Sequence, residues 1–146
     1  VMRAVAKVHR KATEGSKLIF GLDANTYEHA TKGKTQDVLE FASAYRDELL
    51  TSVWGDVPDP KNHTTFNART YLQPQLNKAA RKDEMIEKGD VNPKDFILFS
   101  PMDFSVLQTW KDNTGRREYK EGMVFPTLDF PSDHGVLSAA LVKVQM

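Results

Sequence analysis

The sequence predicts a mixed α/β layer fold, and three observations support this class. Apolar residues recur at helical spacing over residues 1–12 and 35–50. Short β-rich apolar runs lie between turn residues at 17–20, 95–99 and 136–144. The order strand, helix and then several strands fits layers of helix on sheet. We find no internal repeat and draw no domain boundary, so residues 1–146 form a single segment.

The first part of the chain is expected to hold two helices and one strand. Val1 to Ala12 alternates apolar and basic residues with helical spacing. Lys17 to Phe20 predicts a buried strand, which delivers Asp23 and Asn25 at its end. Thr35 to Leu50 predicts a helix with one buried stripe. The residues of this stripe are Val38, Ala42, Tyr45 and Leu49.

The middle of the chain reads as a loop followed by a strand and a surface segment. Trp54 to Pro60 breaks the helical pattern and predicts a loop. Thr64 to Tyr71 predicts a strand, and the charged segment Asn77 to Asp90 predicts a surface helix or excursion. Asp95 to Phe99 is the clearest strand, because it is rich in β-favouring residues.

Three further elements are expected toward the C-terminus. Ser105 to Gln108 predicts a strand, and Asp112 to Gly115 supplies turn chemistry. Met123 to Leu128 is the next candidate strand. Val136 to Val144 is apolar at both alternating sets of positions, which predicts a central strand covered on two sides.

Composition narrows the classes of partner and site. Twenty basic residues balance twenty acidic ones, so a polyanion would have to be bound locally rather than by a global positive field. The chain has no cysteine, which excludes a thiolate metal site or nucleophile and fits a reducing, intracellular compartment. No run approaches the roughly 20 apolar residues of a membrane span, so we expect a soluble protein whose compartment is unknown.

Polar residues gather where the predicted strands end, and strand ends are where α/β folds place their ligands. They are Asp23 with Asn25, then Asp95, then Ser132-Asp133-His134. Taken singly, each of these polar groups more often serves to hydrogen-bond the local backbone in a turn. Together they suit metal-assisted phosphoester hydrolysis, because carboxylates hold a divalent cation or orient water and histidine stabilises developing charge. Adjacent strand residues point to opposite faces, so Ser132-Asp133-His134 is not expected to form a protease triad.

These residues also carry a resemblance to a known family. Leu22-Asp23-Ala24-Asn25, Asp95-Phe96-Ile97 and Ser132-Asp133-His134 resemble, in order, the Gly-Asp-x-Asn, Asp-aromatic-Ile and Ser-Asp-His signatures of the endonuclease/exonuclease/phosphatase superfamily. Within it, the chain most resembles the nocturnin and poly(A)-deadenylase branch. Thr64 to Arg69 and Phe130 to His134 resemble that branch's Thr-Thr-Trp-x-x-Arg and Tyr-Pro-Ser-Asp-His segments. The resemblance spans the chain and implies the second half of a two-sheet α/β sandwich.

The resemblance implies a role for each matched residue. Asp23 would orient or deprotonate the attacking water, and Asn25 would contact the scissile phosphate. Asp133 would bind the catalytic Mg²⁺, or Mn²⁺ in its place. His134 would hydrogen-bond the phosphate, and Asp95 would accept from its other ring nitrogen and favour the imidazolium.

Four further residues have open roles. Phe66 is either a base- or sugar-stacking platform or, as is commoner for a strand phenylalanine, a core residue. Arg69 reaches a phosphate or is an exposed strand-end arginine, and we weigh the two equally. His29 and His63 have no matching role and are expected at the surface.

The match departs from the family in three places. Leu22 replaces a glycine, and a bulkier residue there could narrow the approach of substrate to the backbone. The extra residues, about Pro74 to Asn92, would form a loop that gates or extends a substrate groove. The N-terminal half of the family's domain, which supplies a metal-binding glutamate, has no counterpart here. We therefore expect the isolated chain to be inactive and to expose an apolar sheet face. The N-terminal half is the expected partner on that face, in the same gene product or as a separate chain.

Three functions stay open. The leading one is Mg²⁺-dependent phosphodiester hydrolysis, as an RNA 3′ exonuclease resembling deadenylases, with this chain supplying part of the active site. The second is a nucleotide or phosphoinositide phosphatase, whose substrate binding would depend less steeply on salt. The third is a non-catalytic assembly subunit, which would not bind Mg²⁺ or Mn²⁺.

Overall fold

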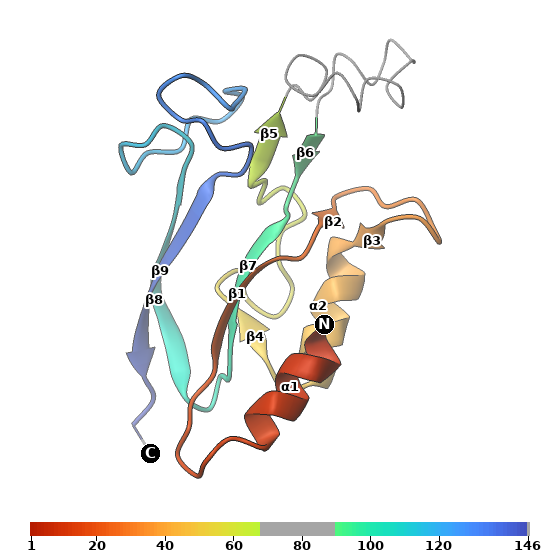
Figure 1. The fold of residues 1–146 in the computed structure, drawn as a ribbon, viewed down its shortest axis with the longest axis vertical. Helices are drawn as coiled ribbons and strands as arrows, with labels where there is room; N and C mark the ends of the chain where they lie inside the picture. Colours follow the sequence, from red (N-terminus) through yellow and green to blue (C-terminus); the bar gives the residue numbers. More distant parts are fainter. Residues whose placement is uncertain (68–89, 146) are drawn as a thin grey trace.

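The computed structural model describes residues 1–67 and 90–145, and its ribbon is drawn in Figure 1. The described part is mixed α/β, with two helices and mostly short strands in small sheets. Helix α1 spans Met2–Arg10 and helix α2 spans Val38–Asp47. Both confirm the helices expected from the apolar spacing. Neither helix, nor any other in the described residues, is long and apolar enough to cross a membrane.

A three-stranded antiparallel sheet forms the middle layer, in the order β1-β7-β4. Its strands are β1 (Ile19–Asp23), β7 (Asp95–Phe99) and β4 (Thr51–Ser52). Phe96 and Leu98 of β7 lie on the face turned toward α2, where they are 1% and 0% exposed. The main core also takes in buried side chains of α1, α2 and the segment after α2. These are Met2, Val38, Phe41, Ala42, Tyr45 and Leu50.

The buried stripe of α2 differs from the expected one at its last position. Leu49 is 82% exposed, whereas the next residue, Leu50, is only 4% exposed. The reason is the helix end. Leu49 adopts a left-handed conformation at φ 61°, and its N–H donates to the carbonyl of Arg46 while that of Leu50 donates to the carbonyl of Tyr45. This is a Schellman cap, which turns the chain and brings Leu50 inward.

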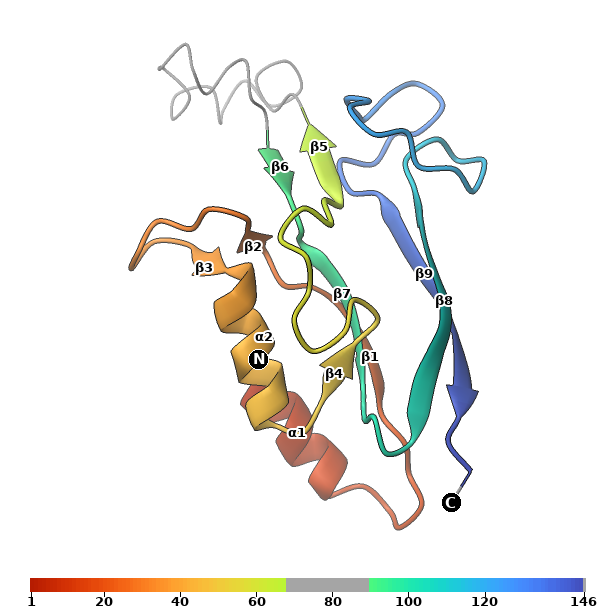
Figure 2. The ribbon, with the colours of Figure 1, turned by 180° about the vertical axis from the view of Figure 1, so that it is seen from behind.

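The third layer is a two-stranded antiparallel ribbon of β8 (Phe104–Asp112) and β9 (Val136–Lys143). In both views it lies across the sheet from the helices (Figures 1 and 2). Thr109 donates to the carbonyl of Val53, and Lys111 donates to the carbonyl of His63, so this set of alternating residues faces the sheet. The opposite face of the ribbon carries Trp110, which is 42% exposed.

Two short strand pairs are the remaining secondary-structure elements of the described residues. β2 (Thr26–Tyr27) and β3 (Gln36–Asp37) are parallel, and they lead into α2. Asp37 caps that helix, because its carboxylate accepts from the N–H of Leu39 at 2.7 Å. β5 (Thr65–Asn67) and β6 (Asp90–Asn92) are antiparallel and lead into β7.

Several expected elements are corrected by the structure. The strand expected at 17–20 begins at Ile19, continues to Asp23 and alternates between exposed and half-buried residues, so it is not buried on both faces. The strand expected at 123–128 is absent from that described segment, whose backbone is irregular with bends at Phe125 and Leu128. The strand expected at 136–144 exists, but among the described residues it pairs only with β8 and its outer face is exposed.

Other expectations are confirmed in whole or in part. The strand at 95–99 and the turn at 112–115 form as predicted, although β8 extends through Asp112. Of the strand expected at 64–71, residues 64–67 are described, and residues 65–67 form β5. The segment expected at 77–90 and most of the extra loop lie outside the described residues, but residues 90–92 form β6 rather than loop.

Candidate functional site

The polar clusters predicted at strand ends meet at one end of the sheet. β1 ends at Asp23 and β7 begins at Asp95, and the two residues are direct partners in the antiparallel register. Partners in such a pair project from the same face. That face is turned away from α2, because the intervening pair Leu22 and Phe96 faces the core. His134 precedes β9, and its ring contacts Asp95 at the start of β7.

His134 lies between the two carboxylates. Its Nδ1 is 2.8 Å from Oδ2 of Asp95, and its Nε2 is 3.9 Å from Oδ2 of Asp23. The side chains of His134 and Asp95 are 28% and 19% exposed, whereas that of Asp23 is 49% exposed. Like charges directly opposite in a sheet repel. A protonated imidazole between them offsets that repulsion.

The pKa of His134 is raised above its ordinary value. The hydrogen bond to Asp95 is the main cause, partial burial opposes it, and the charges of Asp95, Asp23 and Asp133 add to the rise. The histidine therefore holds a proton to higher pH than a free imidazole does. Its Nε2–H, which faces the more exposed carboxylate of Asp23, is then a charged donor for an anionic group.

Thr64 joins the strand that carries Asp95 to the segment that carries His134. Its hydroxyl accepts from the backbone N–H groups of Lys94 and Asp95, both at 3.0 Å. Its backbone carbonyl accepts from the N–H of Gly135 at 2.7 Å. A Cβ on Gly135 would lie 3.3 Å from that carbonyl oxygen, so glycine permits this close approach. Thr64 is 1% exposed and therefore fixes both segments from inside the protein.

Asn25 is held in a turn that follows β1. Its backbone is left-handed at φ 50°, a conformation that asparagine tolerates better than most residues. Its N–H donates to Oδ1 of Asp23 at 2.7 Å, and its side-chain oxygen accepts from Nζ of Lys94 at 3.0 Å. The turn thus ties Asn25 to the same carboxylate that faces His134.

The Ser132-Asp133-His134 segment is a turn stabilised by its own serine. The Ser132 hydroxyl donates to the backbone carbonyl of His134 at 2.8 Å and accepts from its backbone N–H at 3.1 Å. The hydroxyl is therefore bound to backbone and not to the imidazole, as expected for a segment that is not a protease triad. Asp133 is half-buried, and its role as a metal ligand stays a prediction.

Oxygen and nitrogen atoms of Asp23, Asp95 and His134 all lie within 4.8 Å of one another, as in many metal sites. Mg²⁺ prefers oxygen ligands, and a protonated imidazole has no lone pair to offer. The donor set therefore fits a divalent ion only through its carboxylates. Asp23 is the more exposed of the two, and it would hold such an ion together with oxygen ligands beyond this cluster.

The remaining predicted residues have mixed outcomes. Phe66 is half-buried in β5, so a stacking role stays a prediction, and Arg69 lies outside the described residues. His29 is 91% exposed, as expected. His63 is not a free surface residue, because its Nε2 is 2.7 Å from Oε2 of Glu28 and its side chain is 18% exposed.

The departure at Leu22 does not narrow the site, since its side chain packs against the core. Two residues around the site were not assigned a role from the sequence. Lys94 is 1% exposed, against the rule that lysines lie at the surface, and no pattern signals its burial. Thr64 was noted only within a motif, and spacing does not show where a hydroxyl points.

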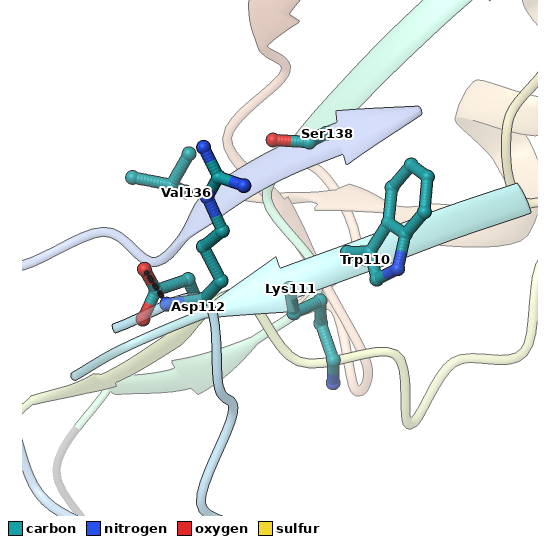
Figure 3. A pocket seen from close by; sticks show the side chains of 6 residues that line it. Trp110, Lys111, Asp112, Val136 and Ser138 are labelled. Atoms are coloured by element: carbon teal, nitrogen blue, oxygen red, sulfur yellow. Dashed lines mark hydrogen bonds between the residues drawn. The ribbon is translucent and has the colours of Figure 1, made fainter. Parts of the chain in front are cut away.

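A separate cavity of about 530 Å³ lies over the outer face of the ribbon (Figure 3). It is lined by Trp110, Lys111, Asp112, Arg117, Val136 and Ser138. Trp110 and Ser138 are direct cross-strand partners. This lining does not include Asp23, Asp95 or His134, so the cavity is distinct from the cluster.

No protein-family model, curated protein or solved structure matches this chain.

Proposed function

We propose that this chain supplies part of the active site of a Mg²⁺-dependent phosphodiesterase. The observation that carries the proposal is the histidine held by one carboxylate at 2.8 Å with its other nitrogen turned toward a second carboxylate at 3.9 Å. Hydrolysis of a phosphoester needs an activated water and a donor for the charge that develops on the phosphoryl oxygens. Asp23 and His134 are suited to these two tasks.

Each residue has a defined part in this proposal. Asp23 orients the attacking water and accepts its proton. His134 donates from Nε2 to a phosphoryl oxygen, and Asp95 keeps the imidazole protonated and aligned. Asn25 donates to another phosphoryl oxygen. A bound Mg²⁺, held through Asp23 or Asp133, would supply Lewis-acid stabilisation of the same charge. The water oxygen bonds to phosphorus as its proton passes to Asp23, the bond from phosphorus to the ester oxygen breaks, and that oxygen takes up a proton from solvent.

The substrate proposed is RNA, cleaved from its 3′ end, and the fold proposed is the second half of a two-sheet sandwich of the endonuclease/exonuclease/phosphatase type. The layer order helix, sheet and ribbon supports that fold, with the cluster at the end where β1, β7 and β9 meet. The support for RNA is the resemblance to the deadenylase branch. Phe66 and Arg69 would bind the polynucleotide, since aromatic and guanidinium groups stack on bases and bind phosphates.

The partner proposed is the N-terminal half of the same domain. The outer face of the ribbon exposes several apolar side chains, with Leu107 70%, Trp110 42%, Val136 51% and Val142 43% accessible. Cross-strand pairing places Trp110 with Ser138 and Asp112 with Val136 on this face. Large exposed apolar faces mark interaction sites in soluble proteins.

The test is hydrolysis by this chain produced together with the coding sequence directly upstream of it. A short oligoadenylate and a generic phosphomonoester are compared with and without Mg²⁺. Asp23→Asn and His134→Ala are each expected to lower oligoadenylate cleavage by about a hundredfold or more. Matched controls are Asp103→Asn, whose carboxylate pairs with Lys17, and His29→Ala, which is 91% exposed. Both should keep full activity.

The outcomes separate the three functions. Cleavage of the oligonucleotide that is lost in both site variants supports the nuclease. Cleavage of the monoester alone supports a phosphatase instead. A folded two-part complex with no turnover and no Mg²⁺ or Mn²⁺ binding contradicts both enzymes and leaves the assembly subunit.

A further inference from the structure

Lys94 is a buried lysine beside the candidate site, and its ammonium is satisfied by three neighbours. It lies between β6 and β7 and is 1% exposed. Its Nζ is 2.7 Å from Oδ2 of Asp90, 3.0 Å from the side-chain oxygen of Asn25 and 4.6 Å from the centre of the Tyr27 ring. Lysines are almost never fully buried unless paired, so this arrangement needs a physical reason.

The backbone of Lys94, like its side chain, is hydrogen-bonded to the turn after β1 that contains Asn25. Its carbonyl accepts from the N–H of Ala24 at 2.7 Å, directly before Asn25. Its own N–H donates to the hydroxyl of Thr64 at 3.0 Å. These two hydrogen bonds fix the backbone of Lys94, so its side chain extends to Asn25 from a fixed position.

An ammonium group has donors only, which settles the orientation of the Asn25 amide. The atom 3.0 Å from Nζ has to be the amide oxygen, so the two N–H groups of the amide point away from Lys94. Asn25 is exposed, which leaves those donors open to a ligand from solvent. The charge on Lys94 also polarises the amide and strengthens its N–H groups as donors.

We propose that Lys94 is a positioning residue that holds the Asn25 amide with both N–H groups presented to a phosphoryl oxygen. This inference rests on the proposed function, in which Asn25 contacts the scissile phosphate. Lys94 itself does not touch the substrate, because it is buried. Asp90 and the Tyr27 ring offset its charge, so the ammonium orients the amide without drawing the anion to itself.

The first test uses inorganic phosphate and does not need turnover. The side-chain N–H signals of Asn25 are followed by NMR in the ¹⁵N-labelled chain as phosphate is added. They should shift on binding in the unsubstituted chain, and in Lys94→Met the half-saturating phosphate concentration should rise about tenfold, the loss expected for one well-aligned hydrogen bond. Lys17→Met is the matched control, since Lys17 also pairs with an aspartate and lies near an aromatic ring, at the opposite end of β1.

A second variant covers the case in which Lys94→Met does not fold. Asn25→Asp keeps an acceptor for Lys94 but has no N–H donor in its side chain. It should fold as stably as the unsubstituted chain and lose the phosphate response, which is then read from the backbone N–H signals of Asn25 and His134. An unchanged phosphate response in Lys94→Met or in Asn25→Asp would overturn the inference, as would the absence of a response in the unsubstituted chain.

If the two-part complex has turnover, a double-mutant cycle of Lys94→Met and Asn25→Ala can be measured in it. Lys94→Met should lower kcat/KM about tenfold, and it should cause no further loss when Asn25 is already alanine. Equal losses in both backgrounds would mean that Lys94 acts only through stability. If the unsubstituted complex has no turnover, the proposed function fails, and the phosphate titration still decides the role of Lys94.

Discussion

Nδ1 of His134 lies 2.8 Å from Oδ2 of Asp95, which joins the start of β9 to the start of β7 across residues far apart in the chain. Asp95 is also the cross-strand partner of Asp23. The contact therefore places a titratable donor between two carboxylates that would otherwise repel each other.

The first prediction concerns the titration of His134. Asp95→Asn should lower the pKa of His134, because it removes both the hydrogen bond and the charge that raise it. Asp23→Asn and Asp133→Asn should lower it less. The measurement is NMR of the imidazole C–H signals of His134 against pH, in the unsubstituted chain and in each variant. Equal effects from the three substitutions would contradict the assigned order.

The second prediction follows from the same shift. A pKa raised by folding contributes stability that is fully present below the unfolded value of 6.5 and is lost as pH rises through the raised value. The free energy of unfolding should therefore fall over that window, and the fall should be absent in His134→Gln. Denaturant titration at several pH values measures it. Catalysis that needs the imidazolium should decline over the same window.

The third prediction concerns Thr64. In Thr64→Val, the N–H groups of Lys94 and Asp95 lose their shared acceptor, which should destabilise the chain by about 1–3 kcal/mol. The pKa of His134 should also fall, since Asp95 is less well aligned. Thr65→Val is the matched control, because Thr65 is equally buried and hydrogen-bonded to Asn92. The control should lose stability and leave the titration of His134 unchanged.

The fourth prediction concerns the cap of α2. Leu49 is left-handed at φ 61° and 82% exposed, so Leu49→Gly should stabilise the chain by about 1 kcal/mol by removing backbone strain. Leu50→Gly should do the opposite, because Leu50 is 4% exposed in the core. Thermal unfolding distinguishes the two. Destabilisation by Leu49→Gly would mean that the cap is not as described.

The fifth prediction concerns the outer face of the ribbon. Leu107→Asp should prevent association with the N-terminal half and leave the isolated chain as stable as before, because Leu107 is 70% exposed. Leu128→Asp is the control, since Leu128 is 102% exposed and lies outside both strands, in the segment that connects β8 to β9. Sedimentation of the mixed halves gives the result. Normal association of the Leu107 variant would remove this face as the docking surface.

The sequence predicted the helices and the clearest strand well, because their signals are local. Apolar spacing identified α2, and β-rich composition identified β7. The inward turn of Leu50 was missed because the pattern does not mark where a helix without a glycine cap stops. The strand expected at 123–128 was wrong because apolar runs of that length also occur in loops that pack against a core, as buried Phe125 does.

For the site, the sequence indicated which residue types gather at strand ends but not what supports them. The meeting of Asp23, Asp95 and His134 depends on register, and the polar strand ends predicted it. The parts played by Thr64 and Lys94 depend on where a hydroxyl and an ammonium point within a packed interior. Such directions are set by tertiary contacts and are not written in the spacing of residues.

Core-facing and site-facing residues alternate along β1 and β7. The strand register that buries the core is therefore the same register that assembles the site. Leu22 and Phe96 pair on the core side, and the next pair, Asp23 and Asp95, projects to the other face. A slip of one residue in β1 would send Asp23 into the apolar core and bring Leu22 out to solvent. A chain with the wrong register is therefore destabilised by the loss of core packing. Folding with the correct register also aligns the two carboxylates.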